Sequence, residues 1–246
     1  MKAGRVIALW RYPVKSFLGE RLDEASLGPD GVDGDRRFAL RNVESGRVLS
    51  AKKVARLLTG RARTENGRVA VSLPDGSEFA VDDVGVDERL SAWLGFPVAV
   101  VRPINDDRRP EMESDDGIYR GRAGTFFDSS PVHFVTSSTL AKLTTFHPEG
   151  RFDPRRFRPN VVLETPVDGF VEETWLGAMM HLGDAQIELT KPCSRCVMTT
   201  HAMDDLPVDR DILRTVNARN DEHVGVYGIV RTPGVVRVGD EATIAR

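Results

Sequence analysis

Short apolar runs that alternate with polar residues and end at turn residues fill the first hundred positions of the chain, a pattern typical of β-strands. Turn residues between these runs predict two hairpins, one around 44–46 and one around 74–76. Two segments space their apolar residues at helical intervals instead, and we expect helices at 51–58 and 86–95. The predicted strands are residues 5–14, 37–43, 47–51, 68–73, 77–81 and 98–102.

The second half of the chain mixes both periods. Helical spacing predicts helices at 137–146, with Thr136 or Ser137 as the N-cap, and at 207–218, which begins with a proline. We therefore expect a strand-rich α+β protein with a barrel-like sheet in its second half. Short β-branched or alternating runs predict strands at 160–164, 179–183, 185–191, 196–200, 224–232, 235–240 and 241–245.

Residues 103–117 interrupt these patterns. The segment is charged, contains prolines and lacks periodicity, which is typical of a linker or a mobile surface loop. We therefore expect a domain boundary near it, with one domain at 1–102 and a second at 103–246.

Composition and charge exclude several classes of partner. Of the 246 residues, 40% are hydrophobic and 29% are charged, as in an ordinary soluble globular protein, and the formal net charge is -3. No excess of positive charge indicates nucleic acid or a membrane surface as a partner, so an anionic ligand would need local basic clusters. The N-terminal apolar run is too short for a signal peptide, and no run approaches the roughly 18 apolar residues of a membrane-spanning helix. We expect a cytoplasmic protein.

The two cysteines, Cys193 and Cys196, lie in the segment KPCSRCVMTT. One pair cannot form a disulfide scaffold, and the neighbouring cations Lys191 and Arg195 favour a thiolate. Four interpretations stay open. A zinc site needs about four ligands, and no histidine stands at metal spacing. A thioredoxin-type pair should open a helix, whereas β-branched residues follow Cys196. In the third interpretation the two cysteines are small residues of the apolar core. In the fourth, one of them is a metal ligand or a nucleophile.

Three basic clusters lie elsewhere in the chain. Each borders an apolar strand, so a rigid scaffold would present its charges at a strand end. Arginine binds phosphate in a bidentate manner, and lysine and serine add single contacts. The alternative is a solvated surface with ion pairs, in which Arg36 pairs with Asp33 or Asp35. The clusters are Arg11 with Lys15 and Ser16, Arg36 with Arg37, and Arg155 with Arg156 and Arg158.

Five segments, in this order, resemble the MOSC family. RYPVKSFLGERL (11–22) and GDRRFAL (34–40) are similar to the start of the N-terminal β-barrel domain that precedes many MOSC domains. RFRPNVV (156–162), the stretch through CSRC (174–200) and the closing segment (224–240) are similar to the MOSC domain itself. The similarity is greatest to the mitochondrial amidoxime-reducing component and its bacterial relatives. The resemblance implies an N-terminal β-barrel-like domain followed by a MOSC β-barrel domain with peripheral helices.

The resemblance also implies a pyranopterin molybdenum cofactor (molybdopterin with Mo). The thiolate of Cys196 is then the catalytic group and the metal ligand, and Cys193 is a neighbour that packs in the core. The basic clusters would neutralise the cofactor's phosphate and its anionic metal centre. The implied cofactor contacts are Lys15, Ser16, Arg37, Ser137, Ser138, Arg158, Asn160, Ser194, Arg195 and Tyr227.

The implied reaction is the reduction of small molecules that carry an N-hydroxyl or N-oxide group, such as amidoximes and hydroxylamines. The redox chemistry would belong to the cofactor, while the protein supplies the ligand and the orientation. No cysteines remain for an iron–sulfur cluster, so we expect a separate redox protein as the electron donor. Two alternatives are a sulfur carrier that holds a persulfide on Cys196 for the assembly of metal–sulfur centres, and a binding protein that has lost its cofactor.

Overall fold

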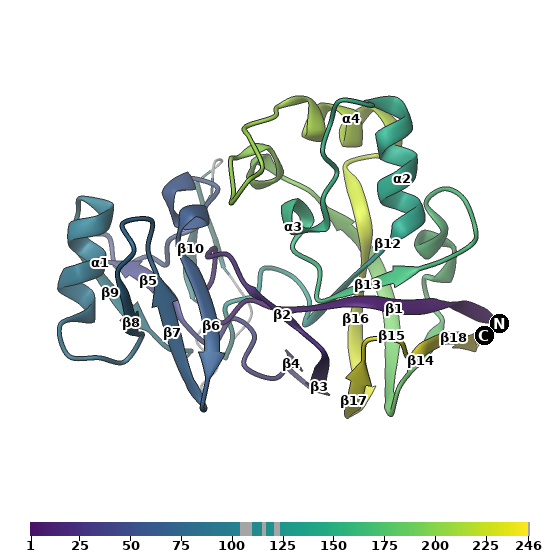
Figure 1. The fold of residues 1–246 in the computed structure, drawn as a ribbon, viewed down its shortest axis with the longest axis horizontal. Coiled ribbons are helices and arrows are strands. Elements are labelled where there is room, and N and C mark those ends of the chain that lie inside the picture. Colours follow the sequence, from purple (N-terminus) through teal and green to yellow (C-terminus); the bar gives the residue numbers. More distant parts are fainter. Residues whose placement is uncertain (104–109, 115–116, 121–123, 246) are drawn as a thin grey trace.

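The structure is a computed structural model that describes residues 1–103, 110–114, 117–120 and 124–245. Two lobes lie side by side: a smaller one that holds α1 and most of the early strands, and a larger one around the long strands β1, β15 and β16 (Figure 1). The two termini meet at the far end of the larger lobe, where the backbone nitrogen of Ile244 donates to the carbonyl of Met1. The chain therefore starts in the larger lobe, builds the smaller one and returns.

Seven strands of the larger lobe close into a barrel, because β1 pairs with β18 on one side and with β13 on the other. Within the barrel β12 and β13 are parallel neighbours, and all other neighbours are antiparallel. The short strand β2 (Glu20–Leu22) extends the sheet beyond β1. The order around the barrel is β13 (Val161–Glu164), β12 (Val132–Thr136), β16 (His223–Thr232), β15 (Ala185–Ser194), β14 (Met179–Leu182), β18 (Glu241–Ala245) and β1 (Lys2–Arg11).

Alternating side chains fill the inside of this barrel. In β15 the buried residues Ala185, Ile187 and Leu189 alternate with half-buried ones. Phe134 of β12 and Met180 of β14 belong to the same fully buried cluster. Because the interior is closed and apolar, removal of these side chains from water is the main force that stabilises the lobe.

The smaller lobe has its own apolar core beneath short antiparallel sheets. Leu90 and Trp93 of helix α1 (Val86–Leu94) lie in this core, and Trp93 meets the ring of Phe17 edge-on with centroids 5.5 Å apart. Met203 and Leu206, from the second half of the chain, complete it. The sheets are β5 (Ala39–Asn42) with β9 (Val98–Val101), β6 (Arg61–Glu65) with β7 (Arg68–Ser72) and β8 (Glu78–Ala80), and β10 (Glu111–Ser114) with β11 (Gly117–Arg120).

Helices pack on the outside of the barrel. Leu143 of α2 (Ser137–Phe146) and Ile212 of α4 (Asp211–Asn220) share a third apolar cluster. In the described part of the chain, no helix has the length and apolar character needed to cross a membrane. The remaining elements are α3 (Pro154–Phe157), the 3₁₀ helices η1 (Ala55–Thr59), η2 (Val171–Trp175) and η3 (Val197–Thr200), and a sheet of β3 (Glu24–Gly28), β4 (Gly31–Val32) and β17 (Gly234–Arg237).

The segment after β1 carries the chain from the barrel into the smaller lobe. Trp10 N donates to the carbonyl of Asn160 at 2.8 Å, which holds the end of β1 on the barrel. Lys15 N donates to the carbonyl of Phe38 at 2.8 Å, which belongs to the smaller lobe. Residues 12–16 therefore lie at the junction of the two lobes.

The structure confirms the strand-rich α+β class and the barrel-like sheet of the second half. The helices predicted at 86–95 and 137–146 are present, and the side chain of Thr136 caps the second one by accepting from Thr139 N. The barrel also uses β1, from the start of the chain, which the periodicity did not indicate.

The hairpin predicted around 44–46 is present but shorter than expected. Arg41 of β5 forms one antiparallel bridge with Val48, and Leu49 N donates to the carbonyl of Leu40 at 2.7 Å. β5 also pairs with β9. Leu49 and Ala51 turn into the core, where Ala51 N donates to the hydroxyl of Ser16 at 3.0 Å. The backbone therefore leaves β5 after a single antiparallel bridge.

The helix predicted at 51–58 is also wrong in extent. Lys53 N and Val54 N both donate to the carbonyl of Ser50, which makes a turn. Only the five residues of η1 follow as a 3₁₀ helix, and its two leucines are buried. The apolar spacing therefore predicted that the two leucines are buried, but it predicted too long a helix.

The strand predicted at 196–200 is the 3₁₀ helix η3. The hydroxyls of Thr199 and Thr200 donate to the carbonyls three residues before them, at 3.0 and 2.7 Å. These local bonds stabilise a tight turn, and they outweigh the strand preference of β-branched residues.

The helix predicted at 207–218 begins later, at Asp211, and ends at Asn220. Asp209 N donates to the carbonyl of Thr200 at 2.9 Å, and the Asp209 side chain accepts from Asp211 N at 2.9 Å. These bonds hold the residues before Asp211 as a loop.

The segment 103–117, predicted to be a linker or loop, contains regular structure. Strand β10 pairs with β11, and Met112 is completely buried beside Ala39 and Phe126. One buried side chain in an otherwise charged stretch gives no periodic signal. Residues 104–109 and 115–116 of this segment lie outside the described residues.

Gly225 of β16 offers a test of how tightly the barrel packs beside the junction. Its φ is +79°, and an added Cβ would lie 2.1 Å from the carbonyl oxygen of Phe134. Gly46 has a similar φ of +70° but open space around it. We expect Gly46→Ala to lower the free energy of unfolding by about 1 kcal/mol, from backbone strain alone. Gly225→Ala should cost ~3 kcal/mol or more, because a backbone clash is added. Urea denaturation measures both, and equal losses would contradict the packing described here.

Candidate functional site

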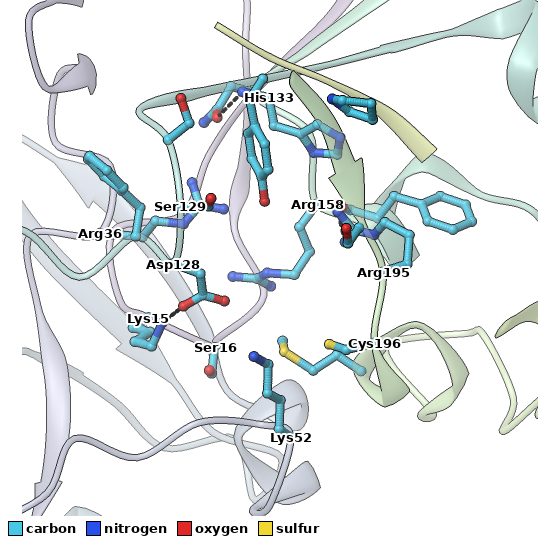
Figure 2. A pocket seen from close by; sticks show the side chains of 18 of the residues that line it. Lys15, Ser16, Arg36, Lys52, Asp128, Ser129, His133, Arg158, Arg195 and Cys196 are labelled. Atoms are coloured by element: carbon cyan, nitrogen blue, oxygen red, sulfur yellow. Dashed lines mark hydrogen bonds and ion pairs between the residues drawn. The ribbon is translucent and has the colours of Figure 1, made fainter. Parts of the chain in front are cut away.

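A cavity of about 340 Å³ lies at the junction of the two lobes (Figure 2). The segment after β1, the loop before β12, the end of α3 and the end of β15 all contribute to its wall. Figure 2 shows the side chains of Arg158, Lys52 and Cys196 directed into the space between these elements. The residues that line the cavity include Lys15, Ser16, Arg36, Lys52, Asp128, His133, Arg158, Asn160, Lys191, Ser194, Arg195, Cys196 and Tyr227.

Charge in this cavity is strongly unbalanced. Among the described residues that line it, Asp128 is the sole carboxylate. The whole chain is slightly acidic, so this concentration of positive charge is local. Such a cavity attracts and holds an anion. The six cations of the wall are Lys15, Arg36, Lys52, Arg158, Lys191 and Arg195.

Two of these arginines are fixed by the ring of Tyr12. The guanidinium carbons of Arg158 and Arg36 lie 4.2 and 4.9 Å from the ring centroid. Arg158 also donates to the carbonyl of Phe17 at 2.7 Å, and Arg36 forms an ion pair with Asp35. Burial lowers the pKa of Arg158 to about 10, so the group remains charged at neutral pH. The cations are thus oriented before any ligand arrives.

Lys15 and Asp128 form a second fixed pair. The Lys15 ammonium is 6% exposed; it donates to the carbonyl of Phe126 at 2.9 Å and pairs with Asp128 Oδ1. The hydroxyl of Tyr119 donates to the same oxygen at 2.6 Å. Burial tends to raise the pKa of the Asp128 carboxyl, but the charges of Lys15 and Lys52 hold it well below its usual range. Asp128 is therefore ionised at neutral pH.

The two cysteines differ in access. β15 ends at Ser194, and Cys196 begins η3 with an extended backbone, half-buried at the cavity wall. Cys193 points inward from β15 and is 0% exposed. Both are free thiols.

Buried Arg156 holds the turn that carries Cys196. Its guanidinium donates to the carbonyl of Thr199 in η3 at 3.0 Å and to that of His201, directly after η3, at 3.2 Å. It also donates to the carbonyl of Pro207 at 2.8 Å. A buried guanidinium with several carbonyl acceptors fixes backbone geometry, so the position of Cys196 depends on α3.

Arg195 connects the cysteine pair to the rest of the wall. It donates to Cys193 Sγ at 2.6 Å and to the carbonyl of Phe157 at 2.9 Å. Burial would raise the pKa of the Cys193 thiol, but the charges of Arg195 and His133 outweigh burial and lower it. The Nε atom of Arg195 is buried and has no hydrogen-bond partner among the residues that the structure describes.

The structure brings most of the sequence-predicted site residues together. Asn160 also serves as a tie: its amide donates to Trp10 O and Asp35 Oδ2, and its oxygen accepts from His133 N. The hydroxyl of Ser16 is likewise already used, by Ala51 N. The residues that line the cavity are Lys15, Ser16, Arg158, Asn160, Ser194, Arg195, Cys196 and Tyr227.

Three predicted residues lie elsewhere. Arg37 is exposed and borders a second cavity, which Arg36 also borders, but of the two only Arg36 lines the cavity at the junction. Ser138 is buried under α2, where its hydroxyl donates to the carbonyl of Gly169 at 2.8 Å. Ser137 accepts from Thr165 N at 3.4 Å. Both serines serve the start of α2 rather than the cavity.

Several cavity residues were missed by the sequence reasoning. Lys52 lies in what was predicted as a helix face, and Asp128 lies in a stretch without periodicity. His133 faces the cavity from a fully buried strand. None of them belongs to a motif, so only a basic pair (Lys52 with Lys53) gave any signal. Within the described ranges no three His, Cys, Asp or Glu side chains gather as a ready metal-ligand set.

Thiol access gives a direct test of this geometry. Protein treated with iodoacetamide should be modified once, at Cys196, because Cys193 is enclosed although its thiolate is favoured. Cys193 should react only after unfolding. Peptide mass spectrometry measures the sites, and the Cys196→Ser variant should show no rapid modification. Comparable rates at both cysteines would contradict the enclosed position of Cys193.

Comparisons with known proteins give two matches to protein families and a set of relatives. In an alignment of 281 positions, the chain is 26% identical to mitochondrial amidoxime reducing component 2 of Macaca fascicularis. The alignment covers 97% of this chain and 83% of that protein. In an alignment of 285 positions, it is 25% identical to mitochondrial amidoxime-reducing component 1 of Homo sapiens. This alignment covers 97% of this chain and 82% of the human protein.

A solved structure shares the fold. The YUAD protein from Bacillus subtilis superposes with a TM-score of 0.53 at 13% identity, over 98% of this chain and 94% of that one. The family model of the MOSC domain matches residues 121–243, and that of the MOSC N-terminal beta barrel domain matches residues 3–92. The chain therefore belongs to the MOSC family, with the N-terminal β-barrel domain before the MOSC domain.

Proposed function

We propose that this chain binds a pyranopterin molybdenum cofactor in the junction cavity, with the Cys196 thiolate as its protein ligand. We propose further that it reduces small molecules with an N-hydroxyl or N-oxide group. The observation that carries the proposal is an accessible thiol beside a cavity with six cations and one described carboxylate. The names of the relatives, which are amidoxime-reducing components, support the same class of reaction.

The residues present fit such a group. A volume of about 340 Å³ is within the usual range for a bound small molecule. A thiolate is a soft ligand suited to a heavy metal, and arginines favour a phosphate. The Nε of Arg195 is a buried donor without an acceptor among the described residues, and a ligand would supply one. Arg36, Arg158 and Lys15 would hold the anionic part, and Cys196 would hold the metal.

When bound, the cofactor supplies two-electron redox chemistry. For an amidoxime the N–O bond breaks, two electrons come from an external donor protein, two protons enter, and the oxygen leaves as water. Against the effect of burial, the charges of Lys15 and Lys52 lower the pKa of the Asp128 carboxyl, which favours the ionised form that accepts hydrogen bonds. The chain's own residues bind and orient, since Arg158 and Arg36 are held by Tyr12 and need no rearrangement.

Two cysteine variants test whether Cys196 is the metal ligand. In protein made in a host that synthesises the cofactor, Cys196→Ser should lose molybdenum and amidoxime reduction, because the metal loses its protein thiolate. Cys193→Ser should retain most of both, since a serine can still accept from Arg195. Elemental analysis and a reduction assay measure the outcomes. An equal loss of molybdenum and of activity in both variants would contradict the assignment of Cys196 as the single protein ligand. A wild-type protein with a persulfide on Cys196 and no molybdenum would favour a sulfur carrier instead.

Neighbouring arginines give a matched pair for the anion-binding wall. Arg36→Gln should weaken binding of the pterin cofactor to the cofactor-free protein about 10-fold or more, because a charge-assisted bond is lost. Arg37→Gln should have little effect, because Arg37 does not line the cavity at the junction. Fluorescence titration and the pterin content of purified protein measure the difference. A larger effect of Arg37→Gln would contradict the orientation of this pair.

A further inference from the structure

Asp128 differs from the other charged side chains of the cavity wall because it carries a negative charge. It is the one described carboxylate in a wall with six cations, and the cavity itself needs no further negative charge to bind an anion. Yet 40% of its side chain is exposed, although its partner Lys15 is nearly enclosed. Figure 2 shows the carboxylate of Asp128 at the edge of the open space, joined by a dashed line to Lys15. A role beyond neutralising Lys15 would explain this position.

The two oxygens of Asp128 are used unequally. Lys15 Nζ and the Tyr119 hydroxyl both donate to Oδ1. No described residue donates to Oδ2. Because Lys15 is itself fixed by the carbonyl of Phe126, the carboxylate is held in one orientation with a free acceptor. An ionised carboxylate accepts hydrogen bonds and donates none.

An acceptor of this kind has value only for a ligand with an N–H or O–H donor. Amidoximes and N-hydroxyguanidines carry an NH₂ group on the carbon next to the N–OH group. Their reduction also yields amidines and guanidines, which are basic and gain positive charge. A fixed carboxylate beside the reacting group favours both the donor and the charge that develops.

We infer that Asp128 determines substrate specificity by accepting a hydrogen bond from an amino group next to the N–O bond, so that N-oxygenated substrates with such an N–H donor react faster than substrates without one. The inference rests on the proposed reductase function. The same N–H chemistry also occurs in a pterin ring, and the experiment below separates the two sources.

The test compares three substrates with one reacting group. Benzamidoxime has two N–H donors, its N-methyl derivative has one, and its N,N-dimethyl derivative has none. With the wild-type holoenzyme we expect kcat/KM for the first two to be similar, and about 10- to 100-fold lower for the third, as for the loss of a hydrogen bond to a charged group. In Asp128→Asn the preference should fall to within about threefold, because an amide nitrogen or a weaker neutral oxygen replaces the carboxylate.

A matched control is Asp168→Asn, which removes the carboxylate of the exposed Lys142–Asp168 pair and should leave the substrate preference unchanged. Equal kcat/KM for all three substrates in the wild type would overturn the inference while the reductase function stands. A fall that begins with the N-methyl derivative would also overturn it, because size would then decide. These two measurements need only the wild type, so they hold even if Asp128→Asn does not fold.

Two further outcomes are distinct. An equal loss on every substrate in Asp128→Asn, together with a lower pterin content, would assign Asp128 to the cofactor and overturn the role in specificity. No reduction of any of the three substrates by molybdenum-loaded wild type would overturn the proposed function itself.

Discussion

The first strand of the chain closes the barrel, and this pairing fixes where the cavity forms. β1 is hydrogen-bonded to β18 on one side and to β13 on the other, so the chain leaves the barrel at a fixed point. The residues that follow are brought against the end of α3 and the turn after β15. Tyr12 consequently meets Arg158, and Lys15 and Ser16 face the same cavity as Cys196. A site assembled from both ends of the sequence follows directly from this strand pairing.

Buried polar side chains then make the junction rigid. Asn160 ties β1 and β12 to Asp35, and Arg156 ties α3 to the turn after Cys196. A buried polar group without a partner costs more free energy than a paired one gains, so each of these ties tolerates little movement. The cavity wall is thus defined by bonds that a ligand does not have to form.

Local pairing leaves the cavity with an uncompensated positive charge. Arg36 has Asp35 and Lys15 has Asp128, while Arg158 rests on the face of Tyr12. Enclosing like charges at a junction opposes folding unless a counter-charge is present. The arrangement therefore favours an anionic occupant, and it places an accessible thiol at the edge of that occupant's space.

Apolar periodicity and motifs are local properties, so they predict the strand-rich α+β class, the helices at 86–95 and 137–146 and the segment that holds both cysteines. The closure of the barrel by β1, the position of Arg36 rather than Arg37 in the cavity wall, and the presence of Asp128 there follow from contacts in the folded chain. The turn at 197–200 escaped prediction for a related reason. Strand pairing, side-chain direction and hydroxyl bonds to a nearby carbonyl depend on which neighbours the folded chain provides, and no period along the sequence encodes them.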